Sequence, residues 1–165
     1  MTFDRAFLIT IGEEGGESNH PADRGGHTYR GVTQRRFTAW LAQNKQDDRD
    51  VITMTEAELR SLAFLGYWKA AHADLLNERC GCLHFDAAFN HGPANAIRLL
   101  QEACGAEVDG AWGPETEQKS RPDCFDAYLD AREKFYIDII ASDPTQKVFR
   151  NGWLNRLKHL REILA

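Results

Sequence analysis

The chain has 165 residues, 42% hydrophobic and 27% charged, which is the composition of an ordinary globular protein. No apolar run approaches the about 18 residues of a membrane-spanning helix, and the scarcity of proline and of low-complexity sequence argues against disorder. The net charge of −5 argues against a nucleic-acid-binding protein with a broad basic surface.

Helical periodicity dominates the chain. Phe3, Phe7 and Ile11 recur every four residues and predict a first helix with Thr2 as its N-cap. Further helices are expected after Thr33, from the capping box Thr55–Glu58, over Cys82–Phe89, from Pro93 through Cys104, from Pro114, over Phe125–Ala141 and over Trp153–Leu164. No stretch sustains an alternation of period two, so strands are restricted to a short hairpin between Gly15 and Thr33. The predicted fold class is all-α, with at most a short β-hairpin or irregular loop.

Glu14 follows the first predicted helix and is the first candidate for chemistry. At about 100° per residue, it shares the inward face of Phe7 and Ile11, whereas Glu13 is rotated toward solvent. Partial burial should raise the pKa of Glu14, as a general acid requires, and the two following glycines would end the helix and let a ligand approach. The pattern alone is equally compatible with an acid of no consequence at a helix end.

The loop after Glu14 supplies two further candidates. Glycines, acids and hydroxyls between Gly15 and Thr33 form a turn system able to bring Asp23 and Thr28 back toward Glu14. Two carboxylates flanking a glycosidic bond are the common arrangement for its hydrolysis, because one protonates the leaving oxygen while the other stabilises the sugar cation or activates water. Taken alone, Asp23 fits an Asx-turn or loop cap better than a catalytic role.

Several short motifs in this region follow one another in a definite order. They are Glu14-Gly15-Gly16, Pro21-Ala22-Asp23, Gly25-Gly26-x-Thr28 and Gly31-Val32-Thr33. In this order they resemble the opening signature of glycoside hydrolase family 108, N-acetylmuramidases with a lysozyme-like fold that are often described as secretion activator proteins. The resemblance continues through Tyr67-Trp68, Asp86-Ala87-Ala88-Phe89-Asn90-His91-Gly92-Pro93, Gln101, Val108-Asp109-Gly110, Trp112-Gly113-Pro114, Thr116, Arg132, Phe135-Tyr136 and Gly152-Trp153-x-x-Arg156.

The resemblance implies a peptidoglycan hydrolase that cleaves the β-1,4 bond between N-acetylmuramic acid and N-acetylglucosamine. The family's catalytic acid falls on Glu14, and the spacing to Asp23 and Thr28 is similar to that of phage-type lysozymes. It also implies a lysozyme-like catalytic part over residues 1–92 and a helical peptidoglycan-domain part over residues 93–165, packed as one compact unit.

The sequence departs from the family at two positions. Glu17 stands where an aromatic residue is usual, and His20 stands where Asp is frequent. The added charge of Glu17 could raise the pKa of Glu14 further or alter substrate choice.

Three residues are candidates for binding the glycan. Tyr67 and Trp68 could stack on sugar rings, although core packing is at least as good an interpretation. Asn90 either caps the following helix or contacts an acetamido group. His84 and His91 have no accompanying ligand cluster, so neither a metal nor another cofactor is expected.

Other polar and aromatic residues have structural interpretations. Arg132 lies among aromatics in mid-helix, where it either snorkels to the surface or pairs with an acid. Trp112 and Trp153 are expected in the core. The cysteines match no zinc spacing and are expected to be plain buried thiols: Cys80, Cys82, Cys104 and Cys124. The C-terminal basic run forms either a solvated helix face or a site for an anionic polymer: Lys147, Arg150, Arg156, Lys158 and Arg161.

The N-terminus lacks the basic and apolar regions of a secretory signal peptide. We therefore expect synthesis in the cytoplasm and action in the periplasm or cell wall after export through a holin or similar pore. The expected partner is the peptidoglycan glycan strand, and the biological role is either prophage lysis, as an endolysin, or secretion. A non-catalytic peptidoglycan-binding module and a lytic transglycosylase remain the alternative functions.

Overall fold

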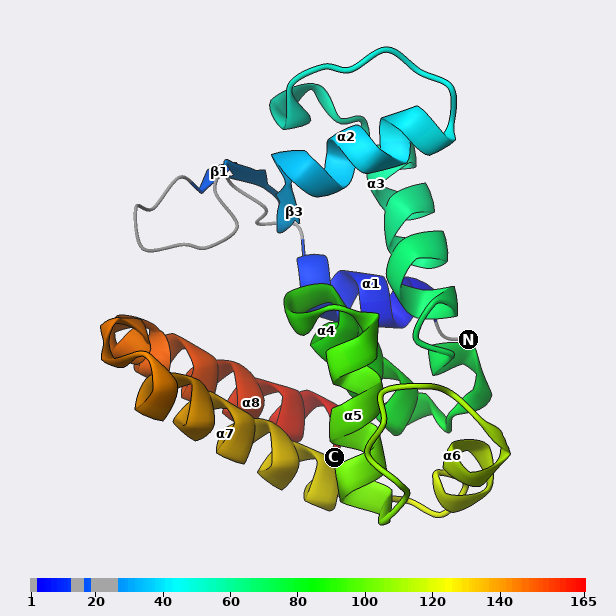
Figure 1. The fold of residues 1–165 in the computed structure, drawn as a ribbon, viewed down its shortest axis with the longest axis vertical. Helices are drawn as coiled ribbons and strands as arrows, with labels where there is room; N and C mark the ends of the chain where they lie inside the picture. The colour runs from blue at the N-terminus through cyan, green and yellow to red at the C-terminus, as the bar shows by residue number, and fades with distance from the viewer. Residues whose placement is uncertain (1–2, 13–16, 19–26) are drawn as a thin grey trace.

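The computed structural model describes residues 3–12, 17–18 and 27–165 (Figure 1). The expected N-cap Thr2 lies outside these residues. The first half of the described chain contains α1 (Phe3–Ile11), β1 (Glu17–Ser18), β2 (Thr28–Tyr29), β3 (Val32–Thr33), α2 (Gln34–Gln43), η1 (Val51–Thr53), α3 (Glu56–Ala63), η2 (Phe64–Lys69) and η3 (Ala73–Leu75). The second half contains α4 (Glu78–His91), α5 (Pro93–Cys104), α6 (Pro114–Lys119), α7 (Phe125–Ser142), η4 (Pro144–Phe149) and α8 (Arg150–Leu164). The fold is mainly α, as predicted.

Local sequence signals explain several of these helix starts. Thr55 and Glu58 form the predicted capping box, in which the Thr55 hydroxyl accepts from the Glu58 amide at 3.3 Å and the Glu58 carboxylate accepts from the Thr55 amide at 2.9 Å. Helices α5 and α6 begin at the predicted prolines, Pro93 and Pro114. Proline suits the first helical turn, where its missing amide hydrogen would have no partner in the helix.

The predicted hairpin is part of a three-stranded antiparallel sheet in the order β1-β2-β3. Thr28 pairs with Ser18 on one side and with Thr33 on the other. Arg30 and Gly31 form the two-residue turn between β2 and β3, and both have positive φ, 49° and 80°. Such a turn matches the right-handed twist of the flanking strands.

Helix α4 is the centre of the core. All residues from Cys80 to Ala88 are buried, and the helix contacts α1, α5, α7 and α8. Its N-cap is Asn77, whose side chain accepts from the Cys80 amide at 3.0 Å. Because burial surrounds α4, its apolar residues follow no single stripe, and the sequence prediction captured only its middle.

The remaining elements lie on either side of α1 (Figure 1). The sheet, α2 and α3 are on one side, and α4, α5, α7 and α8 are on the other. Helices α7 and α8 pack against each other, and α7 also packs on α5. None of the helices in the described parts of the chain combines the length and apolarity needed to cross a lipid bilayer.

The cysteines are free thiols. Cys80, Cys82 and Cys124 are buried, as predicted, whereas Cys104 is only half-buried.

Candidate functional site

Helix α1 ends earlier than the sequence predicted. Its last residue is Ile11, and Gly12 follows with φ +62° while its amide donates to the Leu8 carbonyl at 3.0 Å. The expectation that the glycines at 15 and 16 end this helix is therefore wrong, because the left-handed conformation at Gly12 already does so. Because α1 ends before Glu14, the assignment of Glu14 as the catalytic acid depends on the family motif and no longer on the face of a helix.

Of the three candidate catalytic residues, only Thr28 lies within the described chain. Glu14 and Asp23 are outside the described residues. Thr28 is buried in β2, the middle strand of the sheet. The neighbouring Tyr29 lines the same pocket as Gly12, so the sheet and the end of α1 lie close together.

This first pocket has a volume of about 470 Å³ and is lined from three elements. Its residues are Phe7 and Leu8 of α1 with Gly12 directly after it, Tyr29 and Arg30 from the hairpin, and Glu56 and Arg60 from α3. Arg30 forms an ion pair with Glu56. The Arg60 guanidinium lies 4.7 Å from the centre of the Phe7 ring. Phe7 is itself buried, so the half-buried Tyr29 is the ring that this pocket offers beside the guanidinium groups, an arrangement suited to binding a sugar.

A second pocket, of about 450 Å³, lies on the α8 side of the same helix end. It is lined by the last four residues of α1, Leu8 to Ile11, by Gly12 after them, and by His159 and Ile163 of α8. Gly12 lines both pockets. The end of α1 is therefore open to a ligand from two sides.

A buried ion cluster joins the two halves of the molecule beneath this site. The Asp86 carboxylate of α4 is fully buried and accepts from Arg132 Nη2 of α7 at 2.8 Å and from Arg156 Nε of α8 at 3.0 and 3.1 Å. Burial by itself would raise the pKa of Asp86, but the two guanidinium groups hold it below its usual value. Of the two alternatives predicted for Arg132, snorkelling to the surface or pairing with an acid, the structure shows the pairing.

Asp86 and Arg156 are the residues that sequence reasoning missed in this cluster. A usable signal was present, because Asp86 is the only charged residue in the run from Cys80 to Ala88. An acid in such a run needs a cationic partner from another element.

Tyr67 and Trp68 lie in a π-helix, η2, that continues α3. The Tyr67 ring packs on Phe89, with the Arg36 guanidinium 5.1 Å from its centre. Trp68 packs edge-on against Phe3 and Phe85. Both are more than nine-tenths buried, as the core interpretation expected. Their contact with sugar stays a prediction.

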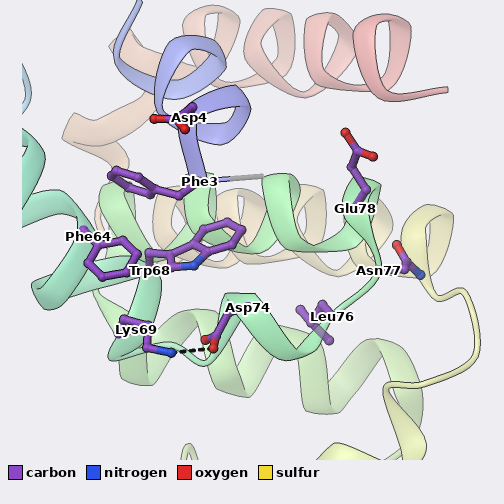
Figure 2. A pocket seen from close by; sticks show the side chains of 9 residues that line it. All are labelled: Phe3, Asp4, Phe64, Trp68, Lys69, Asp74, Leu76, Asn77 and Glu78. Atoms are coloured by element: carbon purple, nitrogen blue, oxygen red, sulfur yellow. Dashed lines mark hydrogen bonds and ion pairs between the residues drawn. The ribbon is translucent and has the colours of Figure 1, made fainter. Parts of the chain in front are cut away.

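Trp68 also lines a pocket of about 380 Å³, shown in Figure 2. Phe3 and Phe64 gather with it on one side, and an ion pair between Lys69 and Asp74 lies on another. Phe3 begins α1, which rises about 1.5 Å per residue, so this pocket is about 13 Å along the helix from Gly12. The pocket is therefore separate from the site at the other end of α1.

Asn90 does not cap the following helix. Its side-chain amide donates to the Asp86 carbonyl at 2.8 Å within α4, and Gly92 is the N-cap of α5. The N-cap interpretation is wrong because the chain reverses at Gly92, where φ is +84°. Contact between Asn90 and an acetamido group stays a prediction.

His84 and His91 contact hydroxyl groups of α7. His84 lies 2.6 Å from the Tyr128 hydroxyl, and His91 lies 3.0 Å from the Tyr136 hydroxyl. No group of three side chains suited to a metal ion is found among the residues that the structure describes.

Part of the C-terminal basic run is paired with acids, and the two tryptophans expected in the core, Trp112 and Trp153, are half-buried. Arg156 binds Asp86, and Arg161 pairs with Asp126 and Asp130 of α7. Trp112 and Trp153 pack against the core. Arg156 thus serves the interior of the protein and not a solvated helix face.

Comparison with known proteins agrees with this architecture. The family model described as Glycosyl hydrolase 108 matches residues 7–92, and the model described as Predicted Peptidoglycan domain matches residues 95–158. The solved structure of Brucella abortus SagA has a TM-score of 0.81 and 25% identity, covering 98% of this chain and 92% of that one. No curated protein sequence matches the chain.

Proposed function

The chain belongs to the glycosyl hydrolase 108 family, and from that premise we propose that it hydrolyses the β-1,4 bond between N-acetylmuramic acid and N-acetylglucosamine in peptidoglycan. The observation that carries the proposal is the family match over residues 7–92, which spans the motif Glu14-Gly15-Gly16 and the hairpin after it. The second match, to a peptidoglycan domain, supports peptidoglycan as the polymer that is bound.

In the proposed mechanism, Glu14 protonates the bridging oxygen of the glycosidic bond. Asp23, ionised, stabilises the oxocarbenium-like transition state or orients a water molecule, and Thr28 hydrogen-bonds that water. The two pockets beside Gly12, which precedes Glu14 by two residues in the sequence, support this assignment, because a glycan strand needs room near the acid that cleaves it.

The test is lysis of chloroform-treated Gram-negative cells by Glu14→Gln protein, with Glu13→Gln as the matched control. We expect Glu14→Gln to lose about 100-fold or more of the activity, since general acid catalysis contributes about 10² to 10⁴. The neighbouring substitution should stay within about two-fold of wild type, and Asp23→Asn should lose less than Glu14→Gln. Full activity in Glu14→Gln would refute the assignment of the acid.

Mass spectrometry of the released fragments separates the proposed reaction from its alternatives. Hydrolysis leaves muramic acid at a reducing end, whereas a lytic transglycosylase leaves a 1,6-anhydro product. Binding to peptidoglycan without any released fragment would indicate a non-catalytic module instead.

A further inference from the structure

The carbonyl group of Thr10 lies in the last turn of α1. The last four carbonyls of a helix have no partner within it and must find donors elsewhere. The Leu8 carbonyl receives the Gly12 amide at 3.0 Å. The Thr10 carbonyl accepts a hydrogen bond from Arg156 Nη2, also at 3.0 Å, and Arg156 lies 146 positions further along the chain. A side chain of α8 thus completes the end of α1.

Arg156 is itself held in a fixed orientation. Its Nε and Nη2 atoms both donate to Asp86, whose carboxylate is anchored from the other side by Arg132. A planar guanidinium bound through two nitrogens to one carboxylate has little rotational freedom. The position of the Thr10 carbonyl is consequently tied to the buried cluster between α4, α7 and α8.

We propose that Arg156 is a positioning residue that holds the last turn of α1 in place for the general acid Glu14. This inference rests on the proposed function. Thr10 and Asp86 lie in the part matched by the glycosyl hydrolase model, whereas Arg156 lies in the part matched by the peptidoglycan domain. The C-terminal part therefore contributes to the chemical step as well as to binding the wall.

The consequence for catalysis is specific. A displacement of about 1 Å in a catalytic group can cost about 100-fold in rate, whereas binding of sugar rings in other subsites does not depend on the acid. Loss of the Arg156 contact should therefore lower kcat and leave KM nearly unchanged.

The experiment compares Arg156→Ala, Arg156→Lys and Arg161→Ala in the full-length protein, using purified glycan strands well below each variant's Tm. We expect kcat to fall by about 10- to 100-fold in Arg156→Ala, with KM within about two-fold of wild type. Arg156→Lys keeps the charge but not the planar guanidinium that spans Asp86 and the Thr10 carbonyl. Its kcat should therefore lie between that of wild type and that of Arg156→Ala.

Arg161→Ala is the matched control. Arg161 is on the same helix, and its substitution removes the ion pairs with Asp126 and Asp130 of α7. Among the described residues, Arg161 forms no hydrogen bond to α1. Its kcat should equal that of wild type. An equal fall in this variant would show a general loosening of α8 and would overturn the proposal.

The remaining outcomes separate this inference from the proposed function. Wild-type kcat in Arg156→Ala, together with inactive Glu14→Gln, would overturn the positioning role alone. Active Glu14→Gln would overturn the proposed acid and the positioning role together. If Arg156→Ala does not fold, Arg156→Lys decides, and an unchanged kcat in that folded variant would refute the proposal.

Discussion

At the scale of single residues, two histidines of α4 are kept neutral by their surroundings. The His84 Nε2 atom donates to the Ala71 carbonyl at 2.8 Å, which leaves Nδ1 to accept from the Tyr128 hydroxyl. Burial lowers the pKa of His84 to about 4 and that of His91 to about 3, and the positive charge of Arg132 acts in the same direction. Both rings contribute to stability only while they remain uncharged.

These two pKa values predict that the protein loses stability in mild acid. When the pH drops below the unfolded-state pKa of about 6.5, the unfolded chain binds protons that the folded histidines do not. The free energy of unfolding therefore decreases as the pH is lowered. Between about pH 7 and about pH 5, each histidine should cost about 2 kcal/mol in urea unfolding experiments. His91→Gln should halve this pH dependence, and an equal change in the exposed His159→Gln control would contradict the explanation.

At the scale of elements, the hairpin and the π-helix both meet α4 at Phe89. The ring of Phe89 packs against Tyr67 of η2, and a Cβ atom on Gly31 would lie only 2.5 Å from Phe89 Cε1. The turn between β2 and β3 can approach α4 this closely because Gly31 has no side chain. The widened turn of η2 meanwhile directs Tyr67 toward Phe89 and Trp68 toward Phe3.

Gly31→Ala should therefore destabilise the protein by about 1 to 3 kcal/mol, because φ of +80° strains an alanine and its Cβ would overlap the ring. The matched control is Gly152→Ala, in a helical turn of α8 where a Cβ meets nothing within 4 Å. That substitution should stabilise by about 0.5 to 1 kcal/mol. Urea unfolding measures both, and equal stabilities would disprove the close contact.

At the scale of the whole molecule, the two parts matched by different family models share one interior. Helix α4 packs on α5 and α7, and the carboxylate of Asp86 is neutralised by arginines from the other part. Breaking a buried ion pair by removing its partner costs about 3 to 5 kcal/mol, a large share of the stability of a small domain.

A fragment of residues 1–92 should consequently show no cooperative unfolding transition, whereas the full chain should unfold in one step. Circular dichroism during urea titration tests this expectation, with the full chain as the control. A cooperative transition in the fragment would show that it is an independent domain and would refute the single compact unit.

The sequence by itself determined the features that depend on neighbours within one helical turn or one hairpin. The capping box at Thr55, the proline starts of α5 and α6 and the location of α7 are of this kind, because their interactions join residues a few positions apart. The end of α1 is the local feature that the sequence predicted wrongly. Gly12 and the glycines at 15 and 16 are equally able to end a helix, so the sequence does not show which of them does.

Only the tertiary structure decided which distant residues meet. The sequence left open whether Arg132 snorkels or pairs with an acid, and its partner Asp86 lies 46 positions away, while the Thr10 carbonyl and Arg156 are 146 positions apart. Periodicity reports which face of a helix is buried but carries no information about what covers that face. The contact between the end of α1 and α8 exists because α4 brings both helices to one buried carboxylate.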